Sequence, residues 1–212
     1  MIKSLNSRYF SGLTVTGLKP ELNTIIARIY GKVGSWEKTK SLVIENNHLQ
    51  TRSLSTAIRL ETELRQRLKH LNESQLKLLA DGSSNERLAM TWLAVLKRVK
   101  LTTELTRELL LEKLEGSDPV LRLSDMKEFY KSKEKQHPEL KALSYSSHKK
   151  IQSTLLSMLR EMGLLAGKVK TTGELGKLQR PNLTTRAIAL IDNEIQLRSG
   201  FLMKPVKGLK RA

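Results

Sequence analysis

Side chains that could bind phosphates or base edges gather where the sequence predicts the start of a long helix. They occupy the run Thr51-Arg52-Ser53-Leu54-Ser55-Thr56-Ala57-Ile58-Arg59, which follows a shorter predicted helix beginning at Trp36. Hydroxyls, free backbone N–H groups and guanidinium groups at a helix start can contact phosphates and base edges together. A short helix, a turn and a longer helix are also how a helix-turn-helix presents its reading helix to DNA. The first candidate DNA-contact surface is therefore Arg52, Ser53, Ser55, Thr56 and Arg59.

A similar pattern recurs later in the chain. Lys149, Lys150 and Gln152 follow the helix start predicted at residues 144–147. Residues 164–170 and 175–178 could then pair as a β-hairpin, which would place Lys168 and Lys170 on a wing, although a plain loop is the alternative. Helix, helix and basic hairpin is the order of a winged helix, so these five residues form the second candidate surface.

The distribution of charge supports a polyanionic partner. The 212 residues include 38 Lys and Arg against 21 Asp and Glu, a formal net charge of +17. Residues 48–70, 144–180 and 198–212 together hold 17 of these basic residues but only 4 of the acidic ones, so they carry +13. An evenly solvated surface would not concentrate charge in this way, which favours binding over the alternative of ordinary solvated helix faces.

The sequence offers little for catalysis. Without cysteine, thiolate metal sites and cysteine nucleophiles are excluded, and the four histidines lack metal-ligand spacing. Asp125 and Pro138-Glu139-Leu140-Lys141 occur in the order of a metal-dependent nuclease site, but they fall in helical sequence, whereas such sites normally lie on strands. Residues 173–178 resemble a phosphate loop but lack its glycine spacing and its Mg²⁺-binding hydroxyl. Aromatic content of 4% argues against a base-stacking platform. We expect a protein without enzymatic activity, cofactor or metal.

Helical periodicity predicts an all-α fold with two helix-turn-helix-like parts around a central helix. Helices are expected near 20–30, 36–46, 53–71, 74–80, 85–101 and 103–114, then from a cap at Ser124, and from 144–147 to an αL glycine at Gly163. Residues 8–17 are predicted to be an arm or short strand. Helix 85–101 is the most apolar and is expected to be the central core helix.

The best internal boundary is Glu115-Gly116-Ser117-Asp118-Pro119. We therefore expect an N-terminal part over 1–116, a C-terminal part over 117–197 and a basic tail over 198–212, with Phe201, Leu202 and Met203 apolar enough to dock on the core. The apolar stretches are far shorter than the roughly 20 residues that span a bilayer. Together with the absence of a signal-peptide pattern at residues 1–8, this predicts a cytoplasmic protein with no membrane partner.

Three stretches resemble the BrxA family of bacterial BREX (bacteriophage exclusion) systems. They are Arg28-Ile29-Tyr30, Ser35-Trp36-Glu37 and Asn46-Asn47-His48-Leu49-Gln50-Thr51-Arg52-Ser53-Leu54-Ser55-Thr56-Ala57, and the similarity continues through 85–101 and 159–165. The resemblance implies an all-α protein that binds double-stranded DNA and works with a BREX methyltransferase and other BREX components. BREX systems methylate host DNA and block phage replication. The family supplies no established catalytic residues to carry over.

Two other functions fit the same basic faces. The protein could be a structural adaptor that docks acidic proteins of the same system, or a helical RNA-binding module of the antitermination type. An adaptor would bind a partner protein without any duplex, and an RNA module would prefer structured RNA to DNA of equal length.

Overall fold

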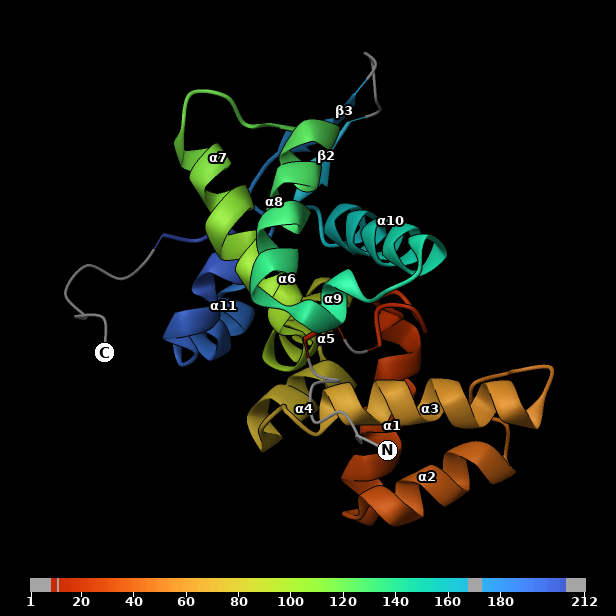
Figure 1. Cartoon of the computed structure of the whole chain (residues 1–212). Coiled ribbons are helices and arrows are strands. Elements are labelled where there is room, and N and C mark those ends of the chain that lie inside the picture. Colours follow the sequence, from red (N-terminus) through yellow and green to blue (C-terminus); the bar gives the residue numbers. More distant parts are fainter. Residues whose placement is uncertain (1–8, 11, 168–172, 205–212) are drawn as a thin grey trace.

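The computed structural model describes residues 9–10, 12–167 and 173–204 and confirms the predicted, mainly α-helical fold (Figure 1). In chain order the helices are α1 (Pro20–Val33), α2 (Trp36–Glu45), α3 (Leu54–Leu68), α4 (Glu73–Asp81), α5 (Ser84–Arg98), α6 (Lys100–Leu105), the π-helix η1 (Thr106–Leu110), α7 (Leu111–Glu115), α8 (Leu123–Gln136), α9 (Pro138–Lys141), α10 (Tyr145–Glu161), α11 (Thr185–Asp192) and the 3₁₀ helix η2 (Ile195–Phe201). The strands are β1 (Val120–Arg122), β2 (Leu165–Ala166) and β3 (Glu174–Leu178).

Helix starts are fixed by hydroxyl caps that the sequence shows. Ser53, Ser83 and Ser144 each precede a helix and accept a hydrogen bond from the backbone N–H three residues on. Each cap satisfies one of the N–H groups that a helix start leaves without a partner. Glu86 completes a capping box with Ser83 and fixes the start of α5.

Helix α5 is the centre of the core, as predicted. Its buried residues include Met90, Trp92, Leu93 and Val95, all fully enclosed. Trp92 Nε1 donates a hydrogen bond to the carbonyl of Gly200, 2.8 Å away, so the segment after α11 returns to pack on this helix. Phe201 and Leu202 are fully buried beside it and Met203 is half-buried, which confirms that this apolar triplet docks on the core.

A buried polar cluster joins the start of the described chain to α6, η1 and α8. Tyr9 Oη donates to Glu104 Oε2 at 2.8 Å, and Lys133 Nζ lies 2.8 Å from Glu104 Oε2 and 2.6 Å from Glu108 Oε2. Burial works against charge on Lys133, but hydrogen bonds to the two glutamates raise its pKa.

The predicted arm or strand at 8–17 is, where described, a series of turns rather than a strand, held by such contacts.

A three-stranded antiparallel sheet of order β1-β3-β2 follows the predicted boundary. The expected hairpin is present, with Leu165 paired to Leu178 and Ala166 to Lys177. Strand β1 was not predicted, and its position corrects the start of α8. Because β1 runs to Arg122, α8 begins at Leu123, and the carboxylate of Asp125 accepts from the Arg122 N–H in place of a Ser124 cap.

Candidate nucleic-acid interface

The turn before α3 is held in place by side-chain hydrogen bonds. Asn47 Oδ1 accepts from the Thr51 N–H at 3.0 Å, and Asn47 Nδ2 donates to the Thr51 carbonyl at 3.2 Å. Asn47 and Gln50 both adopt left-handed backbone angles, which turn the chain sharply between α2 and α3. The result is a fixed entry into α3 rather than a loose loop.

All five residues of the first candidate surface are exposed at the start of α3. Ser53 serves as the cap, since its Oγ accepts from the Thr56 N–H at 3.3 Å and donates to Thr56 Oγ1 at 2.9 Å. Within the described parts of the chain, Arg52 and Arg59 take part in no ion pair. Their charges are therefore available to an external anion.

The other charged residues of α3, which are Glu61, Glu63, Arg65 and Arg67, are buried. Arg65 Nε is 2.6 Å from Glu61 Oε1, and Arg67 Nε is 2.9 Å from Glu63 Oε1. Both pairs are buried. Two of the five basic residues counted at 48–70 are thus buried in ion pairs with the two acidic residues of the helix.

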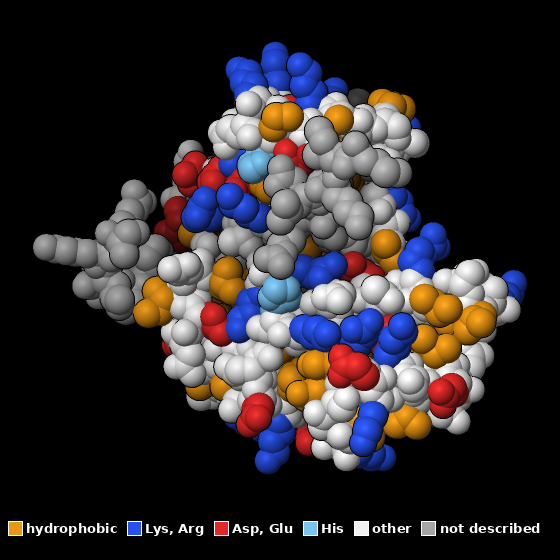
Figure 2. All heavy atoms as spheres, turned by 60° about the horizontal axis from the view of Figure 1, so that its bottom comes forward, with side chains coloured by type: hydrophobic (Ala, Val, Ile, Leu, Met, Phe, Trp, Pro, Cys, Tyr) orange, Lys and Arg blue, Asp and Glu red, His pale blue; other side chains and the backbone are white. Residues whose placement is uncertain are grey.

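Two large apolar residues of α3 face solvent. Leu54 is 64% exposed and Ile58 is 41% exposed. Packing against α1, α2 and α5 buries Ala57, Leu64 and Leu68 but leaves Leu54 and Ile58 on the uncovered side of the helix. Figure 2, which brings the underside of Figure 1 forward, shows many basic side chains with some acidic ones among them, and exposed hydrophobic side chains toward the right edge of the view.

The second candidate surface lies along α10. Ser144 caps this helix as Ser53 caps α3, with its Oγ accepting from the Ser147 N–H at 3.3 Å. Lys149 and Lys150 are exposed and Gln152 is half-buried. Tyr145, 77% exposed, lies with its ring 5.5 Å from Lys149 Nζ, a cation–π contact that sequence reasoning missed. The only acid in α10 is its last residue, Glu161.

The hairpin after α10 provides further basic groups. Lys168 and Lys170 lie outside the described residues. Lys177 is exposed on β3, where its neighbours Gly176 and Leu178 are buried, and the alternation of burial along the strand is the signal that could have found it. Arg160 Nη2 donates to the Leu175 carbonyl at 3.0 Å, which ties the last turn of α10 to the hairpin.

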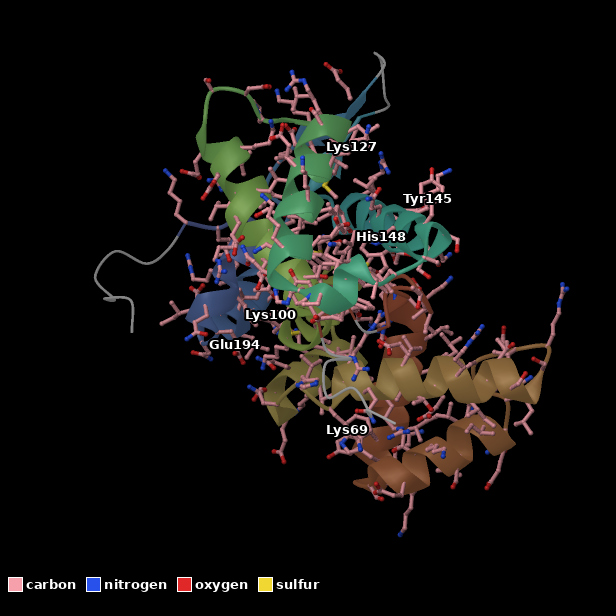
Figure 3. The ribbon with its side chains drawn as sticks, in the orientation of Figure 1. Lys69, Lys100, Lys127, Tyr145, His148 and Glu194 are labelled. Atoms are coloured by element: carbon pink, nitrogen blue, oxygen red, sulfur yellow. The ribbon has the colours of Figure 1, made fainter. Side chains whose placement is uncertain are left out.

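The two surfaces lie on one side of the molecule. In Figure 1 both α3 and α10 begin at the right of the view and run toward its centre. Figure 3 labels Tyr145 at this outer end of α10 and His148 further in. The structure therefore brings the exposed starts of two capped helices, far apart in sequence, to the same side.

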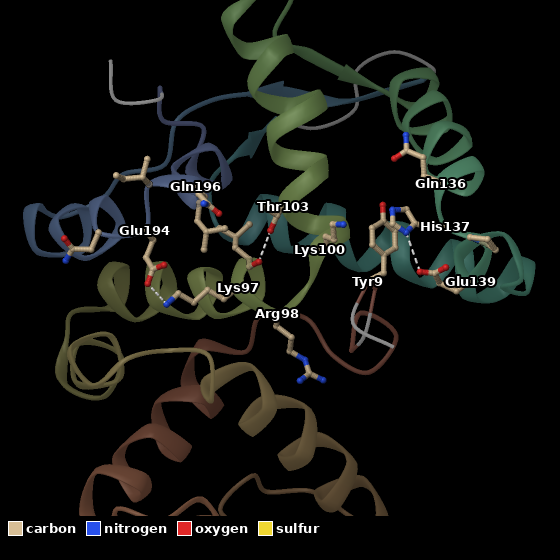
Figure 4. Close-up of a pocket in the computed structure, with 15 residues that line it drawn as sticks. Tyr9, Lys97, Arg98, Lys100, Thr103, Gln136, His137, Glu139, Glu194 and Gln196 are labelled. Carbon is tan, nitrogen blue, oxygen red and sulfur yellow. Dashed lines mark hydrogen bonds and ion pairs between the residues drawn. The ribbon is translucent and has the colours of Figure 1, made fainter. Parts of the chain in front are cut away.

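A cleft of about 1010 Å³ opens elsewhere, between the end of α5, α9 and η2 (Figure 4). Its basic side chains already have acidic partners: Lys97 pairs with Glu194, and Arg98 Nη2 lies 3.1 Å from Glu63 Oε2. At the other wall, the Tyr9 ring stacks on His137 with 3.6 Å between ring centres. The cleft is consequently less suited to a polyanion than the two helix starts.

Within the described residues, His, Asp and Glu side chains form no group of three that could hold a metal ion. Asp125 and Glu139, the carboxylates of the nuclease-like order, contact Lys113 and His137 respectively. None of the helices in the described ranges is long and apolar enough to cross a membrane.

Comparison with known proteins gives the family. A sequence model of the BrxA family matches residues 7–194, most of the chain. The chain belongs to the BrxA family. This confirms the resemblance seen in the three stretches between Arg28 and Ala57. One relative of this BrxA-family protein is "BREX protein BrxA" from Escherichia coli O9:H4 (strain HS), which is 29% identical over 121 residues. That match spans 57% of this chain and 57% of the relative.

A solved structure shares the fold of this BrxA-family protein. It is an uncharacterized protein from Magnetospirillum magneticum, with a TM-score of 0.78 and 18% sequence identity. The similarity covers 92% of this chain and 98% of the other. At this level of identity the likeness concerns the fold alone.

Proposed function

We propose that this BrxA-family protein is a non-enzymatic, cytoplasmic component of a BREX phage-defence system that binds double-stranded DNA, mainly through phosphates. One observation carries the proposal. Two capped helix starts on one side of the molecule expose Arg52, Arg59, Lys149 and Lys150, while the acids of α3 are buried against arginines. Each helix start concentrates positive potential where backbone N–H groups also point outward.

Each surface corresponds to a known mode of DNA contact. Helices α2 and α3 have the order of a helix-turn-helix, and α8, α10 and the β2–β3 hairpin, with β1 at the far edge of the sheet, have the order of a winged helix. Arg52, Arg59, Lys149, Lys150 and Lys177 contact phosphates in this proposal. Ser53, Ser55, Thr56 and Gln152 lie beside them and add hydrogen bonds to the backbone or to base edges.

The name of the Escherichia coli relative supports a place in BREX. In this role, duplex binding would bring the protein and its BREX partners, including the methyltransferase, to the same DNA, and would support host methylation and phage exclusion. No catalytic step is assigned to this chain in the proposal, because its exposed basic residues suit binding and the candidate carboxylates of Asp125 and Glu139 already contact Lys113 and His137.

Fluorescence anisotropy with three labelled probes of equal length tests this function. The probes are a duplex DNA, one of its strands alone and an RNA hairpin. We expect the tightest binding to the duplex, whatever its sequence. Preference for the hairpin would replace the proposal with RNA binding. Absence of binding to all three, with capture of an acidic BREX protein, would replace it with the adaptor role.

A further inference from the structure

The exposed face of α3 combines apolar and positive groups in adjacent rows. Leu54 and Ile58 are four residues apart and so share one row on the helix surface. Ser55 and Arg59 form the next row, and Arg52 precedes the helix. With Leu54 64% exposed and Ile58 41% exposed, the first two turns of α3 present two large aliphatic side chains among hydroxyls and cations.

The charges of α3 indicate what kind of partner would bind this face. The only acids of α3, Glu61 and Glu63, are buried in pairs with Arg65 and Arg67. The exposed charges of α3 are left positive alone, and the helix begins on the same side of the molecule as α10. A polyanion complements both helix starts at once, so the inference that follows rests on the proposed binding of duplex DNA.

Duplex DNA offers few apolar groups to a side chain at its surface. Phosphates are charged, and the minor groove presents hydrogen-bonding atoms. The major groove, however, exposes the C5 methyl group of thymine, which aliphatic side chains contact in sequence reading. We propose that Leu54 and Ile58 of α3 contact thymine methyl groups in the major groove, while Arg52 and Arg59 hold the flanking phosphates.

Helix α10 exposes an aromatic ring, Tyr145, but no large aliphatic side chain. Its outward residues include Ser146, Lys149, Lys150 and Ser153, and the ring of Tyr145 is in contact with the Lys149 ammonium group. The two helix starts therefore have different roles in the proposed complex. Helix α10 and the hairpin act mainly through phosphates, whereas α3 adds a preference for thymine.

A single chemical change in the DNA tests the assignment. Binding is measured by anisotropy to a duplex of alternating adenine and thymine and to the same duplex with uracil in place of thymine. The replacement removes only the methyl groups and leaves phosphates and base-pair hydrogen bonds in place. Wild-type protein should bind the thymine duplex about fourfold more tightly for each methyl group that is buried.

The variants show which side chains recognise the methyl groups. Leu54→Ala with Ile58→Ala should remove the preference and bind both duplexes as wild type binds the uracil duplex. Because both side chains are exposed, the double variant should melt as wild type does. Ile195→Ala is the matched control: Ile195 is 40% exposed on η2, away from α3, and its truncation should keep the preference.

The outcomes separate the inference from the proposed function. Equal wild-type binding to the two duplexes, or a preference that survives in the folded Leu54 and Ile58 double variant, would overturn the thymine contact and leave duplex binding intact. Failure to bind either duplex would overturn both. A double variant that binds DNA as wild type but no longer binds a BREX protein would assign the apolar pair to a protein partner instead.

Discussion

Arg67 Nε donates to Glu63 Oε1 at 2.9 Å, and both side chains are buried beneath the segment that leads into α1. The same guanidinium donates to the carbonyls of Gly17 and Thr16 at 2.7 and 3.1 Å. Arg67 of α3 therefore holds the segment before α1 against the helix through hydrogen bonds. The charge that can act on a partner is the part left outside, on Arg52, Arg59 and Lys69 at the helix end.

Removing Arg67 should destabilise the fold. Arg67→Ala leaves Glu63 buried with Arg98 as its remaining partner and leaves loop carbonyls without a donor. Breaking one side of a buried ion pair typically costs about 3–5 kcal/mol. Urea unfolding measures this loss, and Arg59→Ala on the exposed face of the same helix is the control, with an expected change under about 0.5 kcal/mol. Equal stability of the two variants would contradict the internal role of Arg67.

Removing Arg52 and Arg59 together should weaken duplex binding without changing the melting temperature by more than a few degrees. The double variant Arg52→Ala with Arg59→Ala loses two exposed cations of the first surface. A variant of equal charge, Lys32→Ala with Lys77→Ala, removes two cations from a separate groove between α1 and α4. If the two double variants bind alike, net charge and not the α3 start determines affinity.

Lys149→Ala with Lys150→Ala should weaken binding to every duplex tested, because this surface contacts phosphates. The slope of log affinity against log salt should become less steep by up to about 1.8, or 0.9 for each lost contact. The thymine preference of α3 should remain. A change in sequence preference without a change in slope would assign α10 to base reading.

Lys133 should be essential for stability because its ammonium group neutralises Glu104 and Glu108. We expect Lys133→Met to lower the free energy of unfolding by about 3 kcal/mol. The exposed neighbour Lys131 provides the matched control, Lys131→Met, which should change it by less than about 0.5 kcal/mol. Similar losses in both variants would show that the buried cluster contributes little.

The same cluster predicts a pH dependence with a defined sign. Burial favours the neutral form of Glu104, but hydrogen bonds from Lys133 and Tyr9 outweigh it and lower the pKa below 4.5. The stability gained from this carboxylate is therefore present above pH 4.5 and lost as pH falls through the lowered value. In Lys133→Met the sign should reverse, because a buried carboxyl without its cation is easier to accommodate when protonated. Unfolding curves of the wild-type protein and of Lys133→Met at several pH values measure the two pH dependences.

Deleting residues 204–212 should preserve the fold, since the cut leaves the buried Phe201 and Leu202 in place. The segment carries four cations and no acid, so its loss should weaken binding to all duplexes. The slope of log affinity against log salt should become less steep by up to about 0.9 for each of the four phosphate contacts that these cations could make. Phe201→Ala is the contrasting change, expected to cost about 3–5 kcal/mol of stability. A deletion that unfolds the protein would make the tail structural.

The sequence predicted helices well where periodicity and a cap agree. The helices predicted to start near 53 and 144–147 do so, capped by Ser53 and Ser144, and Gly163 takes the predicted left-handed conformation after α10. Strand β1 has only three residues and pairs with a segment more than fifty residues later, so no local pattern reveals it. Pairing of this kind depends on the tertiary fold.

The candidate surfaces were predicted less completely than the helices. Among the predicted contact residues that the structure describes, only Gln152 is half-buried, and the rest are exposed. The inward Glu61 and Glu63 and the outward Leu54 and Ile58 were missed, because residue type alone favours the opposite placement. Packing of α1 and α5 against α3 decides which face is covered, and the sequence of α3 by itself does not contain that information.

The salt dependence of duplex binding is the most direct test of the central claim. Anisotropy titrations of wild-type protein with one duplex at a series of salt concentrations give log affinity against log salt. If Arg52, Arg59, Lys149, Lys150 and neighbouring cations neutralise phosphates, the plot should be a falling line with a slope of about −0.9 for each contact, less steep in the two double variants. A flat line for the wild-type protein would contradict phosphate binding.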